Sequence, residues 1–317
     1  MLRPWLQATL SSSLALVAGA CTIQLCWGSA LSRSFMRAQP PLVFLSEVAA
    51  GWLGLGVTVA LALALRSGRR APSLRIARGD LRLVVTVFCA LTFIASAAHA
   101  FGLAILPKDA ETARVLALTG PAYAGLEEET VYRGCLLWSL AGRGRTQALV
   151  ASALAFGLGH VPGYGLGEAL SVQLPAGLVY GTLLLRTRSL MAVIAVHASY
   201  DVVALGLEAA SGSAPLHRGL TIAMLAASGA GVLGGRRQLL RELRRLGRTL
   251  VRFPRSPRRV AGALAAGSTV GIVSILGLVV WSTTALLLTA GAIAAGLLVL
   301  RSDDVVRALG GRVSGVD

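Results

Sequence analysis

The longest uncharged stretch of this chain places the strongest limit on its fold. Residues 260–300 are 41 consecutive positions without an Asp, Glu, Lys or Arg side chain. At a rise of about 1.5 Å per residue, a helix of that length is about twice as long as the hydrocarbon core of a bilayer is thick. The stretch therefore predicts a hairpin of two membrane-spanning helices.

Apolar runs of similar character recur along the whole chain. They cover residues 5–31, 42–65, 81–106, 115–141, 146–161, 168–185, 189–210 and 219–235. Apolar residues make up 55% of the chain, charged residues 14%, and the mean hydropathy is +0.71. Such a composition excludes both a soluble globule and a disordered chain, and the runs are longer than barrel strands of about ten residues. We expect an all-α polytopic membrane protein with about ten transmembrane helices.

The basic residues lie almost entirely in the gaps between these runs. The net charge of +16 therefore indicates membrane orientation and anionic lipid rather than nucleic acid. The loops predicted to be cytoplasmic are rich in Arg, and the segment 236–259 has ten Arg against one Glu. This pattern predicts a multi-pass protein of a bacterial inner membrane with both termini inside. In 236–259, leucines at helical spacing predict either a short amphipathic helix on anionic lipid or a plain orientation signal.

Three parts of the chain can be distinguished by the position of their polar residues. Residues 1–114 are expected to form N-terminal transmembrane helices, 115–210 a core that carries the chemistry, and 211–317 C-terminal helices with the Arg-rich arm 236–259 and the hairpin 260–300. The residues before Cys21 resemble a lipoprotein cleavage site. Apolar character continues beyond Cys21, which favours an uncleaved span.

Ionisable side chains inside the spans are few, and each costs at least about 2.5–3.5 kcal/mol to bury in a membrane. Glu47, His99 and Glu208 lie nearer span ends and are interpreted as interfacial groups. The others lie between residues 115 and 210, on three spans: Glu127, Glu128, Glu129, Arg133, His160, His197 and Asp201.

The first polar cluster is Glu127–Glu129 with Arg133. On an α-helix Glu129 and Arg133 are four residues apart and would pair directly. Glu128 would lie about 140° away from Arg133 around such a helix. It is therefore free to accept a proton as a general base. Glu127 has no arginine at a matching spacing and is expected to be peripheral.

The second and third clusters each contain a histidine. Phe156 and His160 share one helical face, and Gly157 between them allows another helix to approach closely. His197 and Asp201 are again four residues apart and face the same way. Two histidines and two carboxylate elements on three neighbouring spans favour a functional site over isolated packed residues.

Taken in order, these clusters resemble the three motifs of the CPBP family of intramembrane peptidases. This family, also called Abi, contains CAAX prenyl proteases and bacteriocin-processing enzymes. The resemblance covers about 115–210, and the residues that carry it are Glu128, Glu129, Arg133, Phe156, His160, His197 and Asp201.

The resemblance implies hydrolysis of a peptide bond within the membrane, without a required cofactor. Glu128 and His160 would activate the attacking water, His197 and Asp201 would stabilise the oxyanion, and Glu129 with Arg133 would hold the site together. Position 201 is often Asn in the family. Because an ionised Asp cannot donate a hydrogen bond, Asp201 would be protonated or would instead orient His197.

Other functions remain compatible with these residues. Glu128, His160 and His197 are alternative zinc ligands of an intramembrane metalloprotease, although we favour a mechanism without metal. A proton-coupled transporter and a non-enzymatic scaffold that binds a membrane peptide are further alternatives. The expected partner is a membrane-embedded peptide or protein, such as a precursor, a leader or a C-terminal sorting tail.

Overall fold

The structure is a computed structural model that describes residues 3–28, 53, 56–62, 64, 72–101, 124–142, 144–251, 253, 257–279, 290, 293, 294 and 297. Among these residues there are helices and short turns but no β-strand, which confirms the all-helical class. Four described helical segments are long and apolar enough to cross a membrane: Arg78–Ala100, Tyr164–Thr187, Leu190–Ala210 and Ala214–Val251. The run 42–65 and the second half of the hairpin 260–300 fall mostly outside the described residues, so the count of ten spans stays a prediction.

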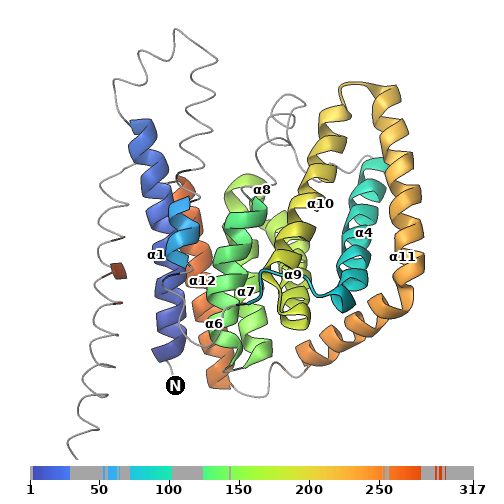
Figure 1. Cartoon of the computed structure of the whole chain (residues 1–317). Helices are drawn as coiled ribbons and strands as arrows, with labels where there is room; N and C mark the ends of the chain where they lie inside the picture. Colours follow the sequence, from blue (N-terminus) through green and yellow to red (C-terminus); the bar gives the residue numbers. More distant parts are fainter. Residues whose placement is uncertain are drawn as a thin grey trace, which may run out of the picture.

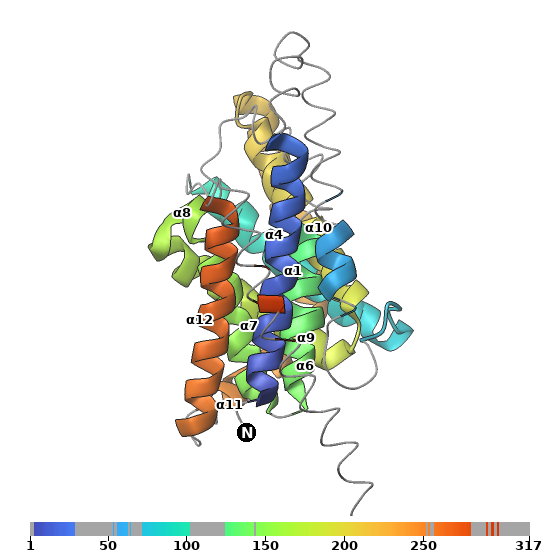
Figure 2. The same cartoon turned by 90° about the vertical axis from the view of Figure 1, so that its left-hand side faces the viewer.

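The helices form one bundle. They are α1 (Arg3–Gly28), α4 (Arg78–Ala100), η1 (Ala124–Leu137), α6 (Trp138–Ala141), α7 (Arg145–Gly159), α8 (Val161–Glu168), η2 (Ala169–Gln173), α9 (Leu174–Thr187), α10 (Leu190–Ala210), α11 (Ala214–Val251) and α12 (Pro257–Val279). Across the bundle in Figure 1, α1 and α12 lie at one side, α7, α9 and α10 in the middle, and α4 and α11 at the other side. Turned by 90°, the same bundle shows α12 beside α1 (Figure 2).

Most predicted runs correspond closely to helices, and α11 is the main exception. The expected span 219–235 and the expected short helix in the Arg-rich arm are parts of one continuous helix, Ala214–Val251. In Figure 1 the lower part of α11 turns aside from the upper part and runs beneath the bundle. Glu242 anchors this part, because its carboxylate binds Arg245 at 2.7 Å and Arg186 at the end of α9 at 3.3 Å.

The helix that carries the glutamate cluster is a π-helix. Residues Ala124–Leu137 follow the i→i+5 hydrogen-bond pattern rather than the expected α-helical one. A π-helix is more loosely wound than an α-helix, so the separation of about 140° between Glu128 and Arg133 does not apply. π-helical segments are rare and are frequent at functional sites.

Local sequence explains the tight turn between α9 and α10. Arg188 ends α9 in the left-handed conformation, with φ of 53°. Ser189 then caps α10, because its hydroxyl accepts a hydrogen bond from the Ala192 amide at 3.1 Å. Ser73 lies against this turn: its amide donates to the Arg188 carbonyl at 2.8 Å, and its own carbonyl accepts from the Leu190 amide at 2.9 Å. The segment before α4 is therefore attached to the start of α10.

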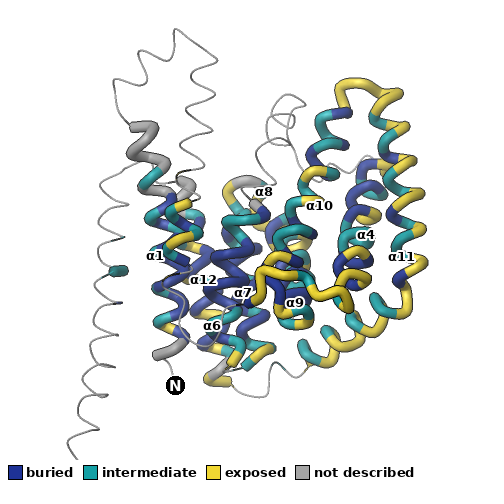
Figure 3. The backbone as a smooth tube through the Cα atoms, viewed as in Figure 1, coloured by how far each residue is buried: buried dark blue, intermediate teal, exposed yellow. Residues whose placement is uncertain are grey.

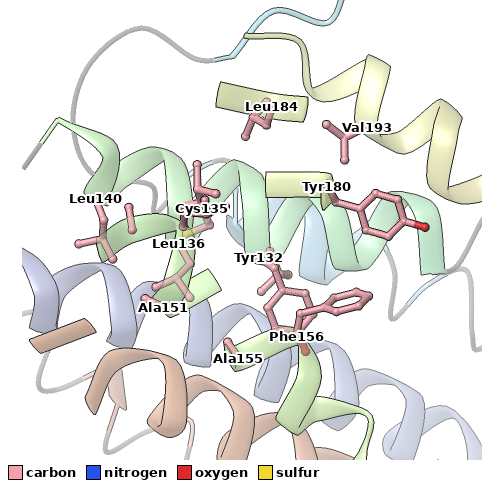
Figure 4. Packing of buried hydrophobic residues seen from close by; sticks show 14 of the residues in the cluster. Tyr132, Cys135, Leu136, Leu140, Ala151, Ala155, Phe156, Tyr180, Leu184 and Val193 are labelled. Carbon is pink, nitrogen blue, oxygen red and sulfur yellow. The ribbon is translucent and has the colours of Figure 1, made fainter. Parts of the chain in front are cut away.

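The most buried part of the molecule lies along α7 and its neighbours. Figure 3 shows buried residues concentrated on α7 and exposed residues along α11. Figure 4 shows Cys135 and Leu136 of η1, Ala151 and Phe156 of α7, and Tyr180 of α9 packed in one cluster. The core therefore joins the helices on which the motifs lie.

Candidate active site

A buried ion pair is the rigid centre of the site. The Arg133 guanidinium lies 3.1 Å from Glu129 Oε1, and neither side chain is exposed. The same Glu129 oxygen lies 2.7 Å from His197 Nδ1. The pairing expected of Glu129 and Arg133 is confirmed, and Glu129 in addition connects η1 to α10.

Aromatic rings surround the buried guanidinium. The Arg133 Cζ atom lies 4.2 Å from the ring centroid of Phe156, 5.4 Å from that of Tyr180 and 5.9 Å from that of Tyr132. Cation–π attraction at a desolvated position is worth about 2 kcal/mol. Arg133 therefore has both a charge partner and an aromatic environment, without lying on the surface of a cavity.

His160 follows the last residue of α7, with one ring nitrogen already bound. Its Nδ1 lies 2.7 Å from the Phe156 carbonyl oxygen, which can only accept a hydrogen bond. The proton of a neutral His160 is therefore on Nδ1, and Nε2 carries the free lone pair. That Nε2 lies 3.6 Å from Glu128 Oε1.

His197 presents its other nitrogen to two carboxylates. Because Nδ1 faces Glu129, Nε2 is the nitrogen that points toward Asp201 Oδ2 at 3.6 Å and toward Glu128 Oε2 at 4.0 Å. In a catalytic triad the orienting carboxylate binds the nitrogen that does not perform the chemistry. Glu129 is placed for that role, whereas Asp201 lies beside the other nitrogen, Nε2.

These side chains open onto one cavity of about 460 Å³. Polar groups at its wall include Glu128, His160, His197 and Asp201. Apolar residues of α4, η2, α9 and α10 form the rest of the lining: Leu91, Ile94, Val172, Pro175, Ala176, Val179 and Leu205. A cavity with a few polar groups in an apolar wall is typical of a binding or active site.

Glycine lets the helices approach closely enough to bring these groups together. A Cβ added at Gly125 would lie 2.8 Å from the Ala198 Cβ, so η1 and α10 touch directly beside His197. A Cβ added at Gly157 would lie 3.0 Å from the Leu174 Cβ, so α7 fits against the start of α9. The close approach expected at Gly157 is therefore confirmed.

The structure gathers the residues expected from the three motifs and leaves others apart. Glu127 hydrogen-bonds Thr58, and neither residue lines the described cavity. His99 and Glu208 form a separate cluster with His217: His99 Nδ1 lies 3.4 Å from His217 Nε2, and its Nε2 lies 4.0 Å from Glu208. Glu47 and the side chain of Cys21 lie outside the described part of the structure. The interpretations of these two residues therefore stay predictions.

Two tyrosines of the site were missed in the sequence. Tyr164 stacks on His160, with ring centroids 5.8 Å apart, and Tyr180 stacks on His197 at 4.6 Å. The spacing of four residues between His160 and Tyr164 could have indicated the first contact. Nothing in the sequence around Tyr180 distinguishes it from a packed aromatic residue.

The structure gives no support for the zinc alternative, which stays a prediction. A catalytic zinc site has three protein ligands about 2.0–2.2 Å from one point. Among the described residues no group of three or more His, Cys, Asp or Glu side chains has a geometry that could hold a metal ion, Glu128, His160 and His197 included. We therefore derive no step that passes through a metal.

One comparison with known proteins finds a similarity to a family over part of the chain. The family model described as Rce1-like, type II CAAX prenyl endopeptidase, matches residues 110–203. No curated protein and no solved structure matches the chain. The matched region contains every residue that carries the resemblance to CPBP peptidases.

Proposed function

We infer from the match of residues 110–203 to the family model described as Rce1-like, type II CAAX prenyl endopeptidase, that this chain hydrolyses peptide bonds. On that premise we propose that it is an intramembrane endopeptidase that cleaves a membrane-associated peptide or protein with water activated by Glu128 and His160. The observation that carries this mechanism is the pair of hydrogen-bond acceptors, Glu128 Oε1 and His160 Nε2, that face one another at 3.6 Å.

Two acceptors at this separation call for a donor between them. The Phe156 carbonyl holds the neutral His160 with its proton on Nδ1, so Nε2 can only accept. One water molecule can donate one proton to Glu128 and the other to His160. Its oxygen then attacks the scissile carbonyl carbon while Glu128 takes the proton. That proton passes to the amide nitrogen as the C–N bond breaks.

His197 and Asp201 are proposed to stabilise the resulting oxyanion. Glu129 holds the Nδ1 proton of His197, so a second proton on Nε2 makes His197 a donor toward the cavity. Asp201 is next to this nitrogen and is therefore placed to act on the same substrate oxygen. The orienting role is already filled by Glu129, which favours a donor role for a protonated Asp201.

The arrangement of basic residues supports the proposed orientation in a bacterial inner membrane. Arg145 and Arg188 line one small cavity, Arg186 binds Glu242 of the lower part of α11, and Ser73 is bound to the α9–α10 turn. These described residues thus meet at one end of the bundle, where α9 ends and α7 and α10 begin. We propose that this end faces the cytoplasm and that exposed arginines of 236–251 contact anionic lipid.

The test uses the full chain in proteoliposomes. A pool of single-span peptides of about 20 apolar residues, with polar flanks, is incubated with the enzyme, and mass spectrometry identifies new termini. We expect defined fragments from the wild type and a loss of cleavage of at least about 10²-fold in Glu128→Gln. Glu127→Gln is the matched control, since Glu127 bonds Thr58 instead, and it should retain cleavage.

The same preparation separates the enzyme from the alternatives. Absence of any fragment with the wild type, or full cleavage by folded Glu128→Gln, would refute the proposal. A proton flux in vesicles without peptide cleavage would favour a transporter, and peptide binding alone would favour a scaffold.

A further inference from the structure

Tyr180 is a buried tyrosine in the wall of the cavity that contains the candidate catalytic groups. Its side chain is 1% exposed. In Figure 4 the phenol extends away from the labelled apolar side chains, with its oxygen at the outer end. Buried tyrosine hydroxyls usually find a hydrogen-bond partner. Because Tyr180 lines the cavity, a ligand bound there can be the partner of its hydroxyl.

The position of Tyr180 identifies which ligand it faces. Tyr180 lines the cavity that contains Glu128, His197 and Asp201. Its ring stacks on the His197 imidazole, with ring centroids 4.6 Å apart. Tyr180 therefore lies on the His197 side of the cavity, which is the side proposed to receive the carbonyl oxygen of the substrate.

The ring of Tyr180 is held in place on several sides. It stacks on the His197 imidazole at 4.6 Å with an angle of 24°, and its edge-to-face contact with Phe156 has a centroid distance of 6.2 Å. The Arg133 guanidinium lies 5.4 Å from its centroid. A hydroxyl on a ring packed in this way needs no reorganisation to donate, as oxyanion stabilisation requires.

The charge in the cavity explains why a neutral donor is needed. The described lining contains Glu128 and Asp201 but no arginine or lysine. Arg133, the nearest buried cation, lies behind the aromatic rings and its guanidinium is engaged with Glu129. Negative charge that develops on a substrate oxygen here must be stabilised by neutral donors or by a protonated histidine.

We propose that the Tyr180 hydroxyl is a further catalytic group, which donates a hydrogen bond to the scissile carbonyl oxygen as it becomes an oxyanion, next to His197 and Asp201. This inference rests on the proposed peptidase function. Tyr164 and Tyr200 also line the cavity, but both are only partly buried, and Tyr132 is engaged with Ser274 through its hydroxyl at 2.9 Å.

The experiment compares Tyr180→Phe with Tyr132→Phe in proteoliposomes, with the peptide that the wild type cleaves best. Tyr180→Phe keeps the stacked ring and removes one oxygen atom. We expect kcat to fall about 10²–10³-fold, the range found for one oxyanion donor, with KM nearly unchanged. Tyr132→Phe removes the same atom from a buried tyrosine outside the described cavity lining, and its kcat should stay close to the wild-type value.

An active wild type with an equally active Tyr180→Phe would overturn the inference while leaving the peptidase function intact. If Tyr180→Leu is then inactive although folded, the ring only positions His197. A wild type that cleaves no peptide refutes the proposed function itself, and is distinguishable from this outcome.

Discussion

Replacement of Glu129 by Gln tests how the centre of the site is held together. The side chains of Glu129 and Arg133 are both completely buried. Glu129→Gln keeps the shape but leaves the guanidinium without its counter-charge. Breaking one partner of a buried pair costs about 3–5 kcal/mol. Folded proteins have a stability of about 5–15 kcal/mol, so the loss is a large fraction of the total.

Part of the cost should be recovered by removing the second charge. In Glu129→Gln/Arg133→Met the thioether replaces the guanidinium between Phe156 and Tyr180, and sulfur packs favourably on aromatic rings. Replacing both partners of a buried ion pair by groups of similar volume is often neutral or stabilising. The double variant should therefore be more stable than Glu129→Gln by several kcal/mol.

In these two variants, a recovery of stability should not restore peptide cleavage. The double variant still lacks the carboxylate that lies 2.7 Å from His197 Nδ1, so it should stay inactive although it folds. Stability is measured by unfolding of the purified variants in detergent, and activity by peptide cleavage in proteoliposomes. The reasoning would be refuted if Glu129→Gln were as stable as the wild type. It would also be refuted if Glu129→Gln/Arg133→Met were no more stable than Glu129→Gln.

Four further predictions concern other parts of the site. Asp201→Asn should keep most activity with less dependence on high pH, and Asp201→Leu should lose about 10²–10³-fold; a folded but inactive Asn variant contradicts the donor role. Gly125→Val should reduce cleavage about 10²-fold, because its Cβ would lie 2.8 Å from Ala198 and displace η1. Gly142→Ala, which meets no atom within 4 Å, is its control, and equal activity of the two variants would be contrary evidence. Cleavage should persist after dialysis against EDTA, and metal-dependent recovery of a lost activity would restore the zinc alternative. The thiol of Arg244→Cys should be labelled only from the cytoplasmic side of the membrane. Labelling from outside would reverse the proposed topology.

The sequence predicted the helices best where an apolar run ends at a strong boundary. The run 189–210 corresponds to α10, Leu190–Ala210, because Arg188 and Ser189 provide a left-handed residue and a helix cap at its start. The length of α11 was not predicted. Its arginines mark the end of the apolar run, but no proline interrupts 216–253, so the helix continues without a break.

The π-helical winding of η1 could not be recognised in the sequence. Residues 129–137 are all buried, so the segment has no hydropathy period that would distinguish an α-helix from a π-helix. The spacing of Glu129 and Arg133 indicated their contact in either case. The sequence could not indicate the neighbours of the Tyr180 ring. Phe156 and His197 lie on α7 and α10, and tertiary packing brings them to Tyr180.

In the candidate site, the sequence predicted the pairs of residues within one helix. It did not predict the contacts between helices. His197 and Asp201 were expected on one face, and they lie 3.6 Å apart. That His197 turns Nδ1 toward Glu129, and thereby Nε2 toward the cavity, depends on the approach of η1 to α10. The roles of the two carboxylates beside His197 therefore required the structure.

The attachment of Ser73 to Leu190 has a consequence for how much of the chain makes a complete enzyme. The family match begins at residue 110, whereas Leu91 and Ile94 of α4 form part of the cavity wall. An excised fragment limited to 110–203 would contain the motifs but would expose that side of the cavity to lipid. During synthesis α4 enters the membrane first and is fastened only when residue 190 has emerged. This side of the cavity wall is thus made before the residues of the three motifs, and it is attached after Glu128 and His160 but before His197 and Asp201.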